Sequence, residues 1–383
     1  MNFELTEEQA MLQKTMKDFV GRQLDPFLDQ FPEAPLPREA VLEVLRMLEP
    51  FGVLNARVPV EDGGNGMSHV ELGLLWEQLP AEIALDVAAN DTIGMRLCQG
   101  GSDELKARYL GPLARGEIMA GSAISEPDTG SDPSGMTTTA VLVGDEYVLN
   151  GNKVWSSHAT IADVLLVAAS MGKDERGRSI IARFLVDTRD SPVQARDIQT
   201  IGLKRHHLGE VTLDGVRVPK GNLIGEPGDG LTRLSLSWLS ARALLGVLSM
   251  GLANRAFEAS LAYAKDRRQF GKPIGAFQLV QELLVEMKTM IDAGRFFCFR
   301  ALDMLDRGVP AKLEASLAKY YATDAGVKVT NMAVEVHGAI GLSCEHSIEK
   351  LLRDARMLTI PDGTIQVQKL MAGRELLGIS AIR

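Results

Sequence analysis

Near the middle of the 383-residue chain stands the segment Tyr147-Val148-Leu149-Asn150-Gly151-Asn152-Lys153-Val154-Trp155. Its β-branched and aromatic residues are typical of strands, and Asn-Gly is the strongest short-range signal for a hairpin turn. Together with Gly144-Asp145 just before it, the segment predicts two hairpin turns between short strands. The strands expected here and further along are residues 139–143, 147–149, 153–156, 164–169, 180–186 and 211–218.

On both sides of this β-rich region the apolar residues recur at helical spacing. Before it, Thr6-Glu7-Glu8-Gln9 resembles a capping box, and further helices are expected around residues 41–48 and 68–79. After Pro219 and the glycine-rich stretch 225–230, the helices become long. They are expected over residues 238–265, 275–307 and 311–336.

The chain is therefore divided into an N-terminal helical domain (1–118), a central β-domain (119–228) and a C-terminal helical bundle (229–383). Strands and helices do not alternate, which argues against a Rossmann or TIM architecture. Gly64-Asn65-Gly66 lacks the third glycine and the preceding strand of a dinucleotide-binding fingerprint. A nicotinamide site is not expected.

Charge and cysteine content exclude several classes of protein. The chain has 41 basic and 50 acidic side chains, a net charge of −9, whereas nucleic-acid binders usually carry a basic surface. The three cysteines are far apart and include no Cys-x-x-Cys pair, so a disulfide framework or zinc site is not expected. Without a signal peptide or an apolar run of about 18 residues, the sequence predicts a cytoplasmic protein.

Four further segments lie in the order, and at the spacing, of sequence motifs of a known enzyme family. They include Ser125-Glu126-Pro127 leading to Gly130-Ser131-Asp132, and Arg267-Arg268-Gln269-Phe270-Gly271-Lys272-Pro273-Ile274. With residues 59–67, 147–155 and 360–368, the chain resembles the acyl-CoA dehydrogenase flavoproteins nearly end to end. This resemblance implies a mainly α fold with a β-barrel-like middle domain and a C-terminal four-helix bundle. It also implies FAD as cofactor, a homotetramer, and an electron-transfer flavoprotein as the electron acceptor.

The resemblance further implies which residues contact the flavin. Trp155 and Ser157 correspond to positions that cover one face of the ring, and Arg267 to a partner of the pyrophosphate on a neighbouring subunit. The whole expected set is Ser122, Ile124, Ser125, Trp155, Ser157, Arg267, Gln269, Phe270, Phe277, Gln278, Glu335, Val336, Gly338, Ala339, Thr364 and Gln366. Glu335 is an awkward member of this set, because a carboxylate repels a pyrophosphate.

For the acyl-CoA, the resemblance implies contacts at Ser131, Arg242 and Gly363, with the backbone N–H of Asp362 in the oxyanion hole. Asp362 stands where most of these enzymes have the glutamate that removes the α-proton. An aspartate is one methylene shorter, and a misplacement of about 1 Å can slow catalysis roughly a hundredfold. Either the substrate lies closer to Asp362, or another carboxylate is the main base.

Asp91 is the second candidate, since it lies in an apolar stretch that the resemblance places beside the acyl pocket. As a base further along the pocket, it would suit a cyclic enoyl-CoA. It would then remove the C3 proton of cyclohex-1-ene-1-carboxyl-CoA while flavin takes the hydride from C6, which gives a conjugated diene. This arrangement is similar to that of family members that act on alicyclic acyl-CoA esters in anaerobic aromatic metabolism. Alternatively, Asp91 merely caps a helix.

Several alternatives remain open. A conventional dehydrogenase of short or branched acyl-CoA would use Asp362 as its base. An impaired flavin- or acyl-CoA-binding protein would have no turnover, and a flavin monooxygenase of the same fold would consume oxygen. His206-His207 is interpreted as a surface turn, and no metal-ligand spacing is found.

Overall fold

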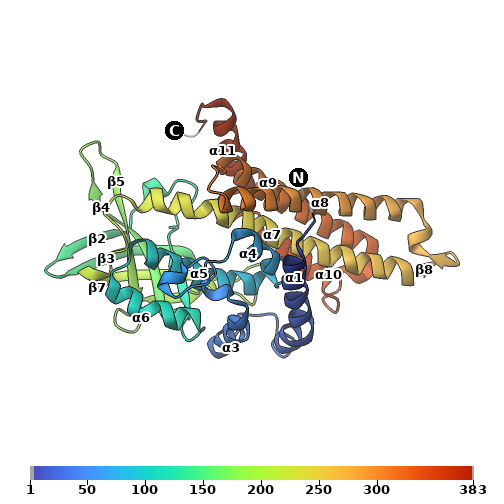
Figure 1. Ribbon diagram of the computed structural model, residues 1–383, viewed down its shortest axis with the longest axis horizontal. Coiled ribbons are helices and arrows are strands. Elements are labelled where there is room, and N and C mark those ends of the chain that lie inside the picture. Colours follow the sequence, from blue (N-terminus) through green and yellow to red (C-terminus); the bar gives the residue numbers. More distant parts are fainter. Residues whose placement is uncertain (1–3, 382–383) are drawn as a thin grey trace.

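The structure of the chain is a computed structural model that describes residues 4–381, apart from the side chains of residues 231–236 (Figure 1). Residues 1–3, on which part of the expectation about a signal peptide rests, lie outside this description. The architecture is the expected one, with helices, then a sheet, then helices. In the described part of the chain, no helix combines the length and the apolar character needed to cross a membrane.

The N-terminal region is helical, and two of its helices begin with capping boxes. Thr6 and Gln9 satisfy each other's backbone N–H groups at the start of the first helix, as predicted, and Ser68 and Glu71 do the same further along. The main helices are α1 (Glu7–Phe19), α2 (Asp25–Leu28), α3 (Arg38–Leu48), α4 (His69–Trp76), α5 (Ala81–Gly100) and α6 (Asp103–Ala114).

The middle region is a seven-stranded sheet. Its strands are β1 (Ala120–Ala123), β2 (Thr139–Val143), β3 (Glu146–Ser157), β4 (Val164–Lys173), β5 (Ser179–Asp187), β6 (Gln194–Asp197) and β7 (Leu208–Pro219). They run in the order β1-β4-β2-β3-β7-β6, with β5 paired to β4. Strand β1 pairs in parallel with β4 and carries the chain from the N-terminal helices into the sheet.

One of the two predicted hairpin turns is wrong. Gly144 and Asp145 do connect β2 to β3. Asn150-Gly151, however, lies inside the continuous strand β3, at a bulge in its pairing with β7. Gly151 has a φ of 150°, and a side chain there would meet the Thr138 Cα at 2.7 Å, so the glycine permits a close backbone approach rather than a turn.

The C-terminal region is dominated by three long helices, which contain or closely match the predicted ones. The elements are α7 (Gly230–Asp266), the short strands β8 (Arg268–Gln269) and β9 (Lys272–Pro273), α8 (Gln278–Asp306), α9 (Lys312–His337), α10 (Ile348–Leu358) and α11 (Ile365–Leu377). A single apolar core joins α7, α8, α9 and α10 to α1, α3, α4 and α5. The sheet lies at one end of the long bundle, and β8 lies at the other end (Figure 1).

Candidate active site

Asp362 lies just before α11, in a backbone conformation that few residues adopt. Its φ is 52° and that of Gly363 is 96°, so two consecutive residues occupy the left-handed region. Burial raises the pKa of the Asp362 carboxyl above its ordinary value of 3.8, although the positive charges of Lys319, Arg242 and Arg96 act in the opposite direction. A carboxylate with a raised pKa is a stronger proton acceptor than an exposed aspartate.

The backbone around Asp362 is held by side chains of two helices. From within α11, Gln368 Nε2 donates to the Asp362 carbonyl oxygen at 2.9 Å. Lys319 of α9 donates from Nζ to the carbonyl oxygens of Gly363, at 2.5 Å, and Thr359, at 3.3 Å. Burial lowers the pKa of Lys319 to about 8. Side chains of α9 and α11 therefore both hold the strained backbone at Asp362 and the residues next to it.

Asp91 lies in the middle of α5 and is completely buried, so the alternative that it caps a helix is wrong. Its Oδ1 accepts the backbone N–H of Arg57 at 2.8 Å, and its Oδ2 accepts Arg57 Nε at 2.5 Å. The same guanidinium donates to Thr92 on α5 and to Ser240 on α7. Arg57 thus holds both oxygens of Asp91 and ties the two helices together.

The flavin residues expected in the middle domain do lie together. The Val154 N–H of β3 donates to the Ser125 carbonyl oxygen at 3.0 Å, which brings the segment after β1 against β3. Trp155 has a φ of 59° and leaves 57% of its side chain exposed. A large ring presented outward from a strained backbone position suits a residue that covers a flat ligand.

A second expected group lies far from the first within one chain. Arg267, Gln269, Phe270, Phe277 and Gln278 belong to the β8–β9 hairpin and the segment that leads into α8, at the opposite end of the bundle (Figure 1). Phe270 is 92% exposed, and its ring lies 5.9 Å from that of Phe277. A single chain therefore does not bring the Trp155 group and the Arg267 group into one site.

The remaining expected residues do not form one group, and those at the end of α9 lie near Arg267. Glu335 to Ala339 form the end of α9 and the turn after it, where His337 stacks on Tyr263 of α7. The Glu335 carboxylate accepts a hydrogen bond from Asn331 Nδ2 at 3.0 Å.

Thr364 caps α11, so Thr364 and Gln366 lie beside Asp362. Ser131 is exposed in the loop after β1, and Arg242 is buried in α7.

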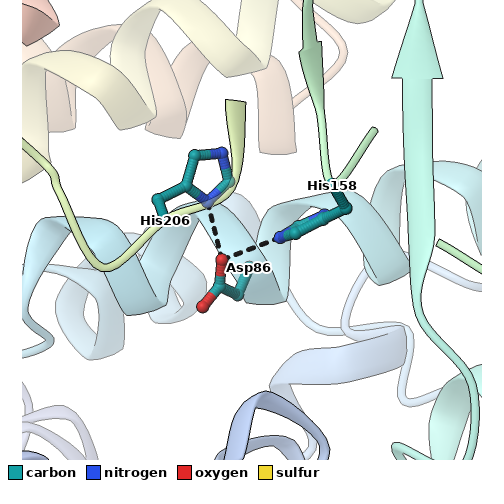
Figure 2. A group of neighbouring side chains, drawn as sticks. All are labelled: Asp86, His158 and His206. Atoms are coloured by element: carbon teal, nitrogen blue, oxygen red, sulfur yellow. Dashed lines mark hydrogen bonds and ion pairs between the residues drawn. The ribbon is translucent and has the colours of Figure 1, made fainter. Parts of the chain in front are cut away.

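The histidines at 206 and 207 are buried, so their interpretation as a surface turn is wrong. Figure 2 shows His206 and His158 converging on Asp86 of α5. Asp86 Oδ1 lies 2.8 Å from His158 Nε2 and 2.6 Å from His206 Nδ1. Burial opposes ionisation of Asp86, but hydrogen bonds to the two histidines keep the pKa of Asp86 below its ordinary value.

Protonation of this cluster follows from its partners. His158 Nδ1 lies 2.9 Å from the Ala120 carbonyl oxygen, which can only accept, so this nitrogen carries a hydrogen. These three side chains offer atoms within 4.8 Å of one another, close enough to hold a metal ion, but their contacts have hydrogen-bond lengths. We interpret the cluster as a clamp between α5 and the sheet.

The clamp predicts how stability depends on pH. Burial lowers the pKa of His206 below its ordinary value of 6.5, so near neutral pH the unfolded chain binds a proton that the folded chain does not. The free energy of unfolding should therefore fall as pH drops below 6.5, by up to about 1.4 kcal/mol per pH unit. Urea unfolding between pH 7.5 and 5.5 should show a smaller slope for His206→Asn than for His346→Asn, which changes an exposed histidine. Equal slopes in the two variants would contradict this assignment.

Three buried cationic side chains near the candidate bases were not singled out from the sequence: Arg57, Arg96 and Lys319. Arg96 had a usable signal, because it is a single charge within the apolar run Ile93-Gly94-Met95-Arg96-Leu97-Cys98. Arg57 had the same signal, as the single charge in residues 51–60, whereas Lys319 stands in a mixed segment. Only the fold shows that both are buried beside the candidate bases.

Family models agree with this geometry over most of the chain. The N-terminal, middle and C-terminal domain models of acyl-CoA dehydrogenase match residues 6–117, 121–216 and 228–377. The chain belongs to the acyl-CoA dehydrogenase family. It is accordingly an oxidoreductase that acts on acyl-CoA thioesters.

Individual relatives of this dehydrogenase differ in their substrates. Glutaryl-CoA dehydrogenase of Desulfococcus multivorans is 34% identical, over 99% of both chains. Cyclohex-1-ene-1-carbonyl-CoA dehydrogenase of Geobacter metallireducens is 33% identical, over 97% of this chain and 99% of its own. Among solved structures, a glutaryl-CoA complex of glutaryl-CoA dehydrogenase superposes with a TM-score of 0.92 at 32% identity, covering 100% of this chain and 98% of that one.

Two further relatives bear on the cofactor and the electron acceptor. The structure of PigA with FAD and proline has a TM-score of 0.90 at 26% identity, over 98% of this chain and 99% of PigA. The CarC subunit of the caffeyl-CoA reductase-Etf complex of Acetobacterium woodii is 32% identical, over 97% of this chain and 99% of its own.

Proposed function

We propose that this acyl-CoA dehydrogenase removes the α-proton of a saturated acyl-CoA with Asp362 and forms the α,β-double bond. The observation that carries this proposal is the contrast between the two candidate bases. Both oxygens of Asp91 are held by Arg57, whereas no described side chain donates a hydrogen bond to the Asp362 carboxylate. A base must have an oxygen available to the proton that it removes.

The residues around Asp362 would support this step. Arg242 and Lys319 lie close enough to interact electrostatically with the carboxylate and help keep it charged. The backbone N–H of Asp362 would bind the thioester oxygen, which makes the α-proton more acidic as charge moves onto that oxygen. Bound FAD supplies the acceptor for the β-hydride.

FAD fits the residues that would hold it. Trp155 offers a broad, exposed aromatic face, and the segment from Ser122 to Ser125 runs beside it. Arg267 is exposed and forms no ion pair with any residue that the structure describes, so its guanidinium can bind a phosphate. Because Arg267 lies far from Trp155 in one chain, the complete site would need a second copy of the chain (Figure 1). An electron-transfer flavoprotein would then reoxidise the flavin, in agreement with the likeness to CarC.

Anaerobic titration of the FAD-loaded enzyme tests the proposal. We expect butyryl- or isobutyryl-CoA to bleach the flavin absorbance and to yield the corresponding enoyl-CoA. Absence of bleaching with every saturated ester would contradict the proposal and favour the impaired binding protein. Oxygen consumption with an external reductant would instead indicate a monooxygenase.

A second candidate function is the 1,4-dehydrogenation of cyclohex-1-ene-1-carboxyl-CoA with Asp91 as base. It is favoured by the likeness to the cyclohex-1-ene-1-carbonyl-CoA dehydrogenase and by the burial of Asp91 in α5. It requires Arg57 to release one oxygen of Asp91 when the ring binds, and Asp91 would then remove the C3 proton while hydride leaves from C6.

Substitution of Asp91 separates these two functions. We expect Asp91→Asn to keep one of the two hydrogen bonds from Arg57, through its amide oxygen, and to lower stability because Arg57 loses its counter-charge. Folded Asp91→Asn should still reduce flavin with butyryl-CoA at a rate within about tenfold of wild type, since no proton-transfer role is lost. Stopped-flow measurement with the saturated and the cyclic ester gives both rates. A loss of about a hundredfold or more, confined to the cyclic ester, would establish Asp91 as its base and overturn our assignment for that substrate.

A further inference from the structure

Lys319 of α9 is a lysine whose side chain is completely buried. Burial of an ammonium group is costly unless hydrogen bonds and a counter-charge compensate it. Its Nζ donates to the carbonyl oxygens of Gly363 and Thr359, at 2.5 and 3.3 Å. Both acceptors belong to the segment between α10 and α11, which also contains Asp362. The contacts that compensate this buried charge therefore lie around the proposed base.

The hydrogen bonds of Lys319 hold a turn in a conformation that few residues adopt. Asp362 and Gly363 both have positive φ, and such a conformation persists only where the surroundings enforce it. Gln368 Nε2 supports the turn from within α11, whereas Lys319 reaches it from a different helix, 44 residues from Gly363 in the chain. The same turn carries the carboxylate and the backbone N–H of Asp362. The positions of both groups therefore depend on Lys319.

Lys319 also provides positive charge beside the Asp362 carboxylate. Burial raises the pKa of Asp362, and Lys319 is the first of three cations that act against this effect, before Arg242 of α7 and Arg96 of α5. Lys319 itself faces Asp362 and Arg242, and burial lowers the pKa of Lys319 to about 8, so at pH 7 the ammonium is mostly protonated. Lys319 thus combines support of the turn with stabilisation of the carboxylate charge.

We infer that Lys319 is a positioning residue for the dehydrogenation, because it fixes both the place and the negative charge of the Asp362 carboxylate. An ammonium group suits both tasks, since it has three hydrogen-bond donors and a full positive charge. Lys319 need not touch the substrate, because both effects act through Asp362. The inference rests on the proposed α,β-dehydrogenation, and adds to it the residue that prepares the base.

Replacement of Lys319 by Met, measured with butyryl-CoA and FAD-loaded enzyme, tests both effects. We expect the kcat of flavin reduction to fall roughly 10- to 100-fold, as for a base displaced by about 1 Å, with KM within about threefold of wild type. Loss of the positive charge should raise the pKa of Asp362, so the low-pH limb of kcat/KM should move to higher pH by about one unit or more. A lysine that only fills space would alter stability without moving this limb.

Matched variants separate charge from packing. Lys319→Arg keeps a positive charge, so it should recover part of kcat and leave the low-pH limb near its wild-type position. Lys328→Met, on an exposed part of α9 where Lys328 pairs with Asp324, should change neither quantity. If Lys319→Met does not fold, Lys319→Gln, which keeps a hydrogen-bond donor without the charge, gives the same pH measurement.

The outcomes distinguish this inference from the proposed function. Unchanged kcat and an unchanged low-pH limb in folded Lys319→Met or Lys319→Gln, beside an inactive Asp362→Asn, would overturn the role of Lys319 alone. Failure of wild type to reduce flavin with any saturated ester, or a wild-type rate in Asp362→Asn, would instead count against the proposed function itself.

Discussion

Replacement of Asp362 by Asn should slow flavin reduction by a saturated acyl-CoA by about 10³-fold, because an amide cannot accept the α-proton. The substitution keeps the size of the side chain and suits the left-handed backbone, since Asn tolerates a positive φ. The enzyme should therefore fold, bind FAD and bind the ester, and lose mainly kcat. Stopped-flow absorbance of the flavin, measured at saturating ester, gives the rate directly.

The pH dependence of the wild-type enzyme provides a control for this assignment. Asp362 acts as a base only when it has lost its proton, so kcat/KM should rise with pH through the pKa of this group. Burial raises that pKa, so the rise should be centred above the ordinary aspartate value of 3.8. A rate close to wild type in Asp362→Asn would show that another group removes the proton.

Replacement of Lys153 by Met should lower the free energy of unfolding by about 3–5 kcal/mol, because it leaves a buried carboxylate without its counter-charge. Lys153 Nζ donates to Glu126 Oε1 at 2.9 Å, and both side chains are almost fully buried. The carboxylate also accepts three hydrogen bonds from Thr137 and Thr138. Although burial favours its neutral form, hydrogen bonds from Thr138, Lys153 and Thr137 lower the pKa of Glu126 to about 2. The bonds from Thr137 and Thr138 remain in the variant and still favour the charged carboxylate.

This ion pair also positions the flavin segment, which gives the prediction a second measurement. Lys153 Nζ donates to the Ile124 carbonyl oxygen at 2.9 Å and so fixes the chain beside Trp155. Urea unfolding should show the loss of stability, and FAD titration should show weaker binding. Lys173→Met, at an exposed position, serves as the control, and Lys153→Met/Glu126→Gln should recover part of the loss. A loss below about 1 kcal/mol would mean that water replaces the lysine.

The sequence predicted the fold well because its signals were local. Capping boxes, apolar periodicity and the Gly144-Asp145 turn each depend on neighbouring residues, and the structure contains all three. The error at Asn150-Gly151 has a long-range cause. The glycine is required by Thr138, which approaches β3 from a different part of the chain, and no turn motif distinguishes that contact from a hairpin.

The site was harder to predict, since its charges are paired across long sequence distances. The apolar neighbours of Asp91 in the sequence did not indicate a partner for it, and its partner Arg57 lies 34 residues away. His158 and His206 both reach Asp86 from the middle domain, 72 and 120 residues along the chain. Side-chain pairing of this kind depends on how the helices and the sheet pack, and residue types alone do not specify it.

The left-handed backbone at position 362 also restricts which acid the fold can accept there. Asp and Asn are several-fold enriched among non-glycine residues with positive φ, whereas longer side chains are not. Aspartate therefore reduces the conformational strain that a glutamate would impose, at the expense of reach toward the substrate. Exchange of aspartate for glutamate at this position would therefore lower thermal stability and shorten the distance from the carboxylate to the substrate. An evolving enzyme that exchanges these two acids would change its substrate range together with its stability.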